Sequence, residues 1–151
     1  MTKRMMIAVL AMIGMFIALY LTLYKMGVIG SLTCSIGSCE TVNTSRWARF
    51  AGLPVAGWGV FFYLDVLIVA LIGIQPLLAR NPVVSWLLVG WAGVGVLFSG
   101  WLTYLELFKI HAICIWCVTS AIIVTLILIV AILDLRETTR LHEHRDQELG
   151  V

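Results

Sequence analysis

The chain has 151 residues, of which 62% are hydrophobic and 12% are charged, and its mean hydropathy is +1.05. A soluble domain is about half apolar and about a quarter charged, so this composition excludes a soluble globular protein and predicts an integral membrane protein. The formal net charge of +2 is too small to indicate a nucleic-acid partner, and membrane lipid is the expected surrounding.

Four apolar segments are long enough to cross a membrane as helices, which takes about 20 residues each. The alternating pattern of a membrane barrel is absent, so we expect an all-α, four-transmembrane-helix bundle over residues 1–135 and a charged tail over 136–151. The first segment lacks a small-x-small cleavage site and is longer than a signal-peptide core, which favours a retained helix. The expected segments are Met5–Tyr24, Val55–Ile74, Val83–Phe108 and Ala112–Leu135.

The four cysteines form two pairs, Cys34 with Cys39 after the first segment and Cys114 with Cys117 at the start of the last. Four crossings place both pairs on the same side of the membrane. Six basic residues lie on the side of the chain termini and four on the side of the cysteines, which favours cytoplasmic termini. The cysteines would then lie outside the cytoplasm, where lasting disulfides occur, and the expected location is a plasma or bacterial inner membrane. The six are Lys3, Arg4, Arg80, Arg136, Arg140 and Arg145, and the four are Lys25, Arg46, Arg49 and Lys109.

The residues alone leave three interpretations of these cysteines open. Two structural disulfides are disfavoured because Cys114 and Cys117 are too close along one helix for a comfortable bridge. A four-cysteine zinc site is allowed by the spacings, but one pair lies at the membrane surface, and we expect no metal. In the third interpretation, a redox relay, a helix beginning near His111 holds Cys114 as a thiolate in its first turn. Cys117, one turn deeper, would then reach a lipid-soluble cofactor and receive electrons by thiol–disulfide exchange from the outer pair.

A longer pattern supports the relay. The stretch CETVNTSRWARFAGLPVAGWGVFFY, from Cys39 to Tyr63, resembles vitamin K epoxide reductase and its bacterial homologues. The resemblance covers about residues 30–125 and also includes the late C-x2-C motif, whereas the first segment matches only in being hydrophobic. The matching positions after the loop cysteines are Ser45, Gly52, Leu53, Pro54, Gly59 and Tyr63.

The resemblance implies a quinone-linked thiol–disulfide oxidoreductase. Cys34 and Cys39 would take electrons from a thioredoxin-fold, DsbA-like protein outside the cytoplasm, and Cys39 would then exchange with Cys114. Cys117 would reduce a membrane quinone, menaquinone or ubiquinone, and the product would be disulfide bonds in other proteins. The partner is expected to be a separate protein because the chain is too short for the thioredoxin-like domain that is fused in some bacterial members. A quinone-epoxide reductase and a non-enzymatic scaffold with two structural disulfides are the alternatives.

The resemblance also implies a quinone pocket inside the bundle and a short interfacial helix in the first extracytoplasmic loop, here Asn43–Phe50. Ser45 would support the thiolate or the quinone, or cap that helix. An Asn of vertebrate members is replaced by the apolar Val55–Ala56 pair, and a Tyr one turn after the C-x2-C motif is replaced by Ala121. The expected pocket residues are Cys117, Pro54, Val55, Trp58, Tyr63, Tyr104, Trp116 and Ala121.

Two acidic residues near or within the apolar segments need an explanation. Asp65 falls in the middle of the second segment, and we expect it to be protonated or satisfied between helices, with a proton-transfer role as the alternative. Glu106 precedes Lys109 by three residues, which favours an ion pair on one helix face, with proton delivery to the quinone as the alternative.

Overall fold

The computed structural model describes residues 2–34, 37–78 and 81–150. Within these residues, four helices are long and apolar enough to cross a membrane, which confirms the predicted all-α membrane bundle. The elements, in chain order, are α1 (Thr2–Lys25), α2 (Cys39–Thr44), the 3₁₀ turn η1 (Arg46–Ala48), β1 (Arg49–Phe50), β2 (Leu53–Pro54), α3 (Val55–Ile74), α4 (Pro82–Leu105), the π-helical turn η2 (Glu106–Ile110) and α5 (Ile115–Leu149).

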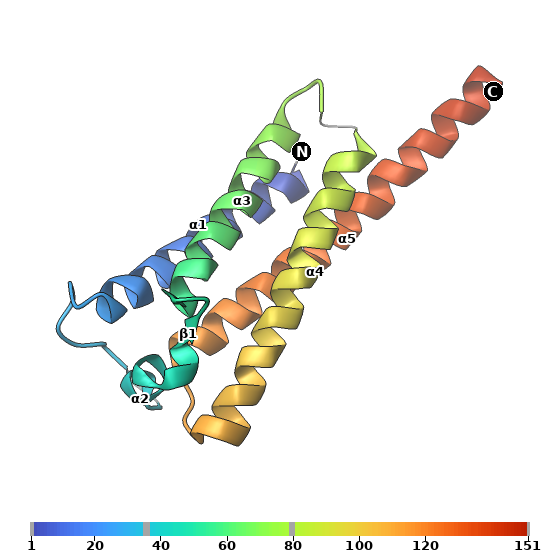
Figure 1. The fold of residues 1–151 in the computed structure, drawn as a ribbon. Coiled ribbons are helices and arrows are strands. Elements are labelled where there is room, and N and C mark those ends of the chain that lie inside the picture. Colours follow the sequence, from blue (N-terminus) through green and yellow to red (C-terminus); the bar gives the residue numbers. More distant parts are fainter. Residues whose placement is uncertain (1, 35–36, 79–80, 151) are drawn as a thin grey trace.

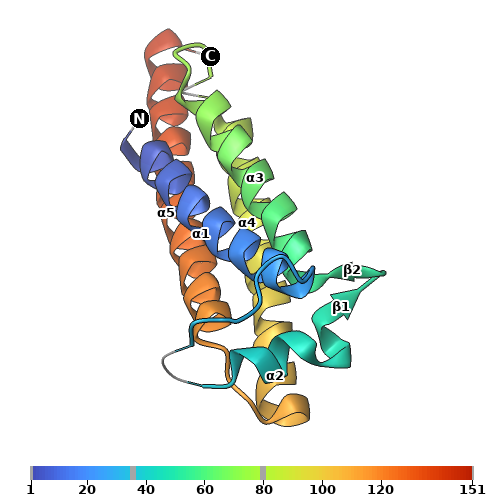
Figure 2. The same cartoon turned by 90° about the vertical axis from the view of Figure 1, so that its left-hand side faces the viewer.

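The four long helices form a bundle in which α1 packs against α3 and α5, and α4 packs against α5 and α3 (Figure 1). Both ends of the described chain lie at one end of the bundle, and the last turns of α5 extend beyond it. The short helix α2 and the β1–β2 hairpin lie at the opposite end (Figure 2). The loop after α1 and the link between η2 and α5 also lie there, so both cysteine pairs come from one end of the bundle.

Local sequence explains where the helices begin and end. The Asn81 side chain accepts a hydrogen bond from the Val83 N–H at 2.9 Å, and Pro82 follows at the first helical position, which together start α4. At the other end of the bundle, Gly27 takes a positive φ of 77° just after α1, the conformation that commonly ends a helix. The predicted second segment, Val55–Ile74, coincides with α3.

Close packing between helices depends on small residues. A Cβ on Gly14 of α1 would lie 2.4 Å from the Tyr63 ring of α3. A Cβ on Gly95 of α4 would lie 2.4 Å from the Phe62 ring, also of α3. Small residues allow helix backbones to approach in membranes, where lipid gives no hydrophobic drive for association. These contacts fix where α3 places Tyr63, which matters for the site below.

Two local predictions were wrong in their boundaries. The last long helix begins at Ile115 rather than near His111, because η2 is followed by His111 with φ 54° in the left-handed region, which stops a helix. The short helix spans Cys39–Thr44 rather than Asn43–Phe50, because Ser45 is extended and separates it from η1. The charged tail from Arg136 continues α5 as far as Leu149.

A buried ion pair joins the helices at the end of the bundle that carries the chain termini. The Arg4 guanidinium is 1% exposed and donates to Asp134 Oδ2 at 2.9 Å and to the Ser85 hydroxyl at 3.0 Å. It also donates to the carbonyl oxygens of Gly73 and Leu78. Arg4, which the sequence suggested as a charge that sets membrane orientation, is therefore also a link between α1, α3, α4 and α5. Arg80, another of those charges, lies outside the described residues.

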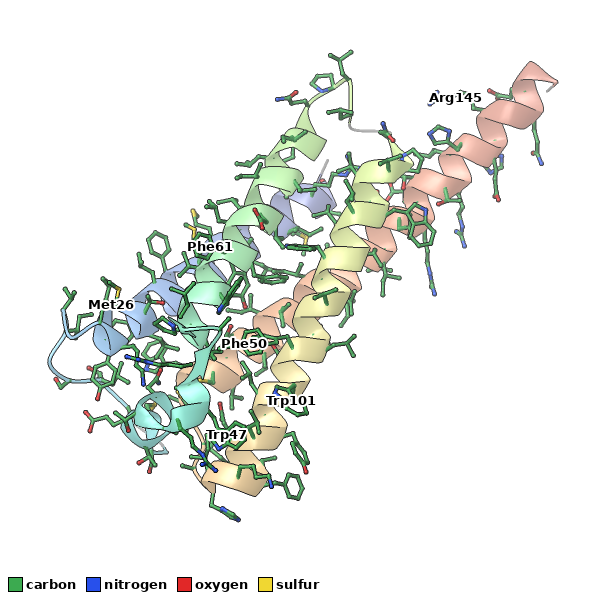
Figure 3. The ribbon with its side chains drawn as sticks, in the orientation of Figure 1. Met26, Trp47, Phe50, Phe61, Trp101 and Arg145 are labelled. Carbon is green, nitrogen blue, oxygen red and sulfur yellow. A yellow bond between two sulfur atoms is a disulfide. The ribbon has the colours of Figure 1, made fainter. Side chains whose placement is uncertain are left out.

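The outer surface of the bundle is apolar. Phe61 of α3 points away from the other helices and is 58% exposed, as expected of a lipid-facing side chain (Figure 3). Asp65, one turn further along α3, is also exposed. The expectation that its carboxyl is satisfied between helices is therefore wrong.

Candidate active site

The first loop carries its cysteine pair onto the start of α5. Cys34 and Cys39 form a disulfide, with their Cα atoms 6.2 Å apart. Gly37, between them, pairs with Cys114 as an antiparallel bridge, and the Ser38 N–H donates to the Ile113 carbonyl at 2.9 Å. Cys39 and Cys114 are both buried, at 1% and 0% exposure. The backbone pairing thus brings the outer disulfide next to the inner cysteine pair.

Gly37 is the residue that permits this approach. Its φ is 93°, and a Cβ at this position would lie 2.2 Å from the Ile113 carbonyl oxygen. An L side chain rarely adopts this φ and would collide with that carbonyl. The glycine of the TCSIGSCE loop is therefore a requirement of the contact with α5 rather than a source of general flexibility.

Cys114 directly precedes α5, and the Val118 N–H donates to its carbonyl at 3.0 Å. The Cys117 thiol donates a hydrogen bond to the Cys114 sulfur, and this bond holds the pKa of Cys114 below its ordinary value. The backbone N–H groups of Cys117 and Trp116 act in the same direction, whereas burial and the Glu106 carboxyl oppose it. Since the thiolate is the nucleophile, Cys114 keeps its reactive form to a lower pH than an ordinary cysteine does.

Asn43 of α2 links the two cysteine pairs. Its amide nitrogen donates to the Cys39 carbonyl at 3.0 Å and lies 4.0 Å from the Cys114 sulfur. The side chain is 7% exposed, and the Lys25 ammonium donates to its backbone carbonyl. A buried amide held from both sides in this way keeps α2 in register with the start of α5.

Cys117 faces a cavity between the helices, and Cys114 does not line it. The cavity has an empty volume of about 1010 Å³, including the space at its opening. Its walls are mostly apolar, and its polar side chains include Lys25, Asn43, Ser45 and Glu106. A mostly apolar pocket with a few converging polar groups is the usual form of a small-molecule site. The aromatic head of a quinone fits this lining, because its ring needs apolar walls and its oxygens need hydrogen-bond donors.

Glu106 lies in the wall of this cavity, next to both inner cysteines. It is 5% exposed, and its Oε2 accepts a hydrogen bond from the Cys114 backbone N–H at 3.3 Å. Its carboxyl also forms a hydrogen bond with the Cys117 side chain. The predicted ion pair with Lys109 is wrong. Among the described residues, the salt bridges are Lys3–Glu137 and Arg4–Asp134.

The structure places five of the expected site residues on the cavity wall, namely Ser45, Pro54, Val55, Tyr63 and Cys117. The Tyr63 hydroxyl bonds to Ser120, at 2.9 Å from its carbonyl oxygen and 2.8 Å from its hydroxyl oxygen, which closes the wall between α3 and α5. The Ser45 hydroxyl donates to the Val42 carbonyl at 2.8 Å and so ends α2.

The other expected pocket residues do not line this cavity. The Trp116 indole N–H donates to the Thr33 carbonyl at 3.0 Å and so holds the loop next to Cys34. The Trp58 indole N–H donates to the Phe50 carbonyl at 3.0 Å. Tyr104 is 47% exposed and stacks on Phe108, and Ala121 lines a separate shallow groove with Thr103 and Thr125.

Sequence reasoning did not single out Asn43 and gave Lys25 and Trp47 no part in the pocket. All three line the cavity. The pattern held no signal for Asn43, because its role depends on α2 folding back against α5. In the part of the chain that the structure describes, no three His, Cys, Asp or Glu side chains come together in an arrangement that could hold a metal ion. The outer cysteines form the disulfide Cys34–Cys39, and Cys114 and Cys117 are free thiols.

Comparison with known protein families gives one match over most of the chain. The family model described as the vitamin K epoxide reductase family matches residues 5–132. The matched range includes all four cysteines, α2 and the whole of the cavity wall, and it ends before the last turns of α5.

Proposed function

The chain belongs to the vitamin K epoxide reductase family and is a membrane oxidoreductase, and we propose that it oxidises an extracytoplasmic dithiol protein at the expense of a membrane quinone. The donor is a separate thioredoxin-fold, DsbA-like protein. The acceptor is menaquinone or ubiquinone, and the cellular product is disulfide bonds. The observation that carries this proposal is the pairing of Gly37 with Cys114, which sets an outer disulfide against an inner pair whose second cysteine faces the cavity.

The order of steps follows from accessibility. Cys34, partly exposed in the loop, is where a protein partner reaches the chain, and the partner's thiolate attacks there. Cys39, released as the leaving thiolate, is buried beside Cys114 and attacks it when Cys114 and Cys117 are disulfide-bonded. Each exchange breaks one S–S bond and forms another, so no electrons are lost between the pairs. The partner's second thiol then releases Cys34, and Cys34 attacks Cys39 in the Cys39–Cys114 disulfide and frees Cys114. The oxidised outer pair and the reduced inner pair correspond to the stage after this last step.

The cavity residues would hold the acceptor. Lys25 would donate to a quinone oxygen through the N–H groups that the Asn43 carbonyl does not occupy, and Pro54, Val55 and the Tyr63 ring supply the apolar wall. A bound quinone supplies the two-electron oxidant that returns Cys114 and Cys117 to the disulfide. The burial of Cys114 excludes direct attack by a protein partner, so electrons enter through the outer pair and leave through Cys117.

The test is quinone reduction in liposomes, with a reduced DsbA-like protein as donor. The wild type is expected to consume quinone and to accumulate partner disulfide in equal amounts, and Cys117→Ser to fall to background. Folded wild-type protein that leaves the quinone oxidised would overturn the proposal. Turnover of a quinone epoxide without turnover of the partner would favour the epoxide reductase.

A further inference from the structure

We propose that Glu106 is a catalytic residue that takes the proton of the Cys117 thiol and passes it to the oxygen of the bound quinone. This inference rests on the proposed function. It concerns a carboxyl that neither the exchange between cysteine pairs nor the binding of a partner requires.

The first support is the position of the carboxyl. Glu106 is the first residue of the π-helical turn η2, and this wider turn directs its side chain inward rather than toward Lys109, which is exposed. π-helical turns inside helices are frequent at functional sites. With 5% exposure, the carboxyl is largely withdrawn from water yet lies on the cavity wall. A buried ionisable group in a membrane helix is costly and usually functional.

The second support is the set of partners. Glu106 Oε2 is held by the Cys114 backbone N–H at 3.3 Å, and its carboxyl bonds to the Cys117 side chain. The Cys114 N–H can only donate, so it fixes the carboxyl, and the single Cys117 thiol proton is shared between the Glu106 carboxyl and the Cys114 sulfur. The carboxyl and Cys117 line the same cavity, in which the quinone would bind, and the bond to the Cys114 N–H holds the carboxyl beside the inner cysteine pair.

The surroundings hold few other groups that could do this work. From α5 and the residue directly before it, Cys117 and Cys114 are the titratable groups with a described interaction with the carboxyl. From α1, Lys25 lines the same cavity, but its ammonium is bonded to the Asn43 carbonyl. From α2, which packs against η2, Cys39 is in the disulfide and Glu40 is exposed. His111 and Lys109, next to η2, are exposed.

Cys114 stands as a thiolate and Cys117 as a thiol, and a new S–S bond forms between them while the Cys117 S–H bond breaks. The two electrons reduce the quinone to the hydroquinone. One proton passes from Cys117 Sγ to the Glu106 carboxylate and then to a quinone oxygen, and the second comes from water. Glu106 is unchanged over the cycle, and total charge is conserved.

The test compares wild type with Glu106→Gln, which keeps the size of the side chain and an oxygen for the Cys114 N–H. Residue-resolved alkylation of Cys117 in detergent, without quinone, is followed over a range of pH. In the wild type, the alkylation rate should fall at acid pH as the carboxyl is protonated. In Glu106→Gln, the fall in alkylation rate that comes from protonation of the carboxyl, here called the acid limb, should vanish. The rate should then follow the hydroxide concentration alone. Glu106→Asp should retain the limb.

A second readout is single-turnover oxidation of the inner pair by a short-chain ubiquinone. Glu106→Gln should be slower by about 100-fold, the lower range of general acid–base catalysis. Glu143→Gln, an exposed carboxyl near the end of α5, is the matched control and should behave as wild type in both assays. Identical alkylation profiles for Glu106→Gln and wild type would overturn the proposal even if the quinone is reduced. A lost acid limb in a protein that reduces no quinone would instead count against the proposed function alone.

Discussion

At the residue scale, the site depends on contacts that only particular side chains allow. Gly37 lets the first loop meet Ile113, Asn43 spans from Cys39 to Cys114, and Glu106 turns in from η2. Each of these residues contacts Cys39 or Cys114 through its backbone or its side chain. Three residues from three different segments therefore position the two cysteine pairs against each other and beside the cavity.

Gly37→Ala tests the first of these contacts. The added Cβ collides with the Ile113 carbonyl, and alanine at this position has to keep a positive φ. The paired state of residues 37 and 114 should therefore be destabilised by about 2 kcal/mol. The population of the state in which Cys39 lies against Cys114 should fall by about 30-fold, and the exchange rate with it. Stopped-flow measurement of electron transfer from the outer to the inner pair checks this. Gly30→Ala, where a Cβ meets nothing within 4 Å, should leave the rate unchanged.

At the scale of the elements, sequence pattern predicts the long helices well. The four apolar segments are confirmed, and α3 has the predicted boundaries because Pro54 stands directly before it and its apolar run is unbroken. The start of α5 was misplaced, since the apolar pattern continues through Ile110 and Ala112 while the backbone does not. A π-helical turn and a left-handed His111 interrupt it, and neither leaves a periodic signal.

The pocket was harder to predict than the cysteines. The C-x4-C and C-x2-C spacings mark the thiols by themselves, whereas the facing direction of an aromatic residue depends on helix rotation. Tyr63 turns inward because Gly14 leaves space for its ring. Trp58 and Tyr104 turn outward and bond or stack locally. Helix rotation is set by such interhelical contacts, which one sequence does not display.

A hydrogen bond from the Trp116 indole also joins the loop after α1 to α5. Trp116→Phe removes the N–H that donates to the Thr33 carbonyl but keeps an aromatic ring against Tyr20. Local opening of the loop should become easier by about 1 kcal/mol, the usual net value of a hydrogen bond. Hydrogen exchange at the amides of residues 33 and 34 should therefore accelerate by about 5-fold. Equal protection in both proteins would show that the bond does not hold the loop. Trp86→Phe, lipid-facing on α4, is the control.

At the scale of the whole molecule, the two ends of the bundle have different tasks. One end carries the thiols and the cavity, and the other is joined by the Arg4–Asp134 pair and its hydrogen bonds. In Figure 3, Trp47 and Arg145 lie near these opposite ends. The end of the bundle opposite the thiols is thus the end at which all four long helices are joined by buried polar contacts.

Breaking this buried pair should be costly. Arg4→Met leaves the Asp134 carboxyl buried without its cation, and a loss of about 3–5 kcal/mol in unfolding free energy is expected. The double variant Arg4→Met with Asp134→Leu removes both charges and should recover most of that loss. Lys3→Met, which breaks an exposed pair with Glu137, should cost about 0–1 kcal/mol. Unfolding in mixed detergent measures all three. A double variant no better than Arg4→Met would contradict the account.

The central claim is that electrons pass from the outer pair to the inner pair through Cys39 and Cys114. The most direct measurement uses the double variant Cys34→Ala with Cys117→Ala, in which only those two thiols remain, under mild oxidation in detergent. An intramolecular Cys39–Cys114 disulfide should form rapidly and be detected by mass spectrometry. The matched variant Cys34→Ala with Cys114→Ala, which leaves Cys39 and Cys117, should form its disulfide far more slowly. Equal rates in the two variants, or no Cys39–Cys114 bond, would contradict the relay.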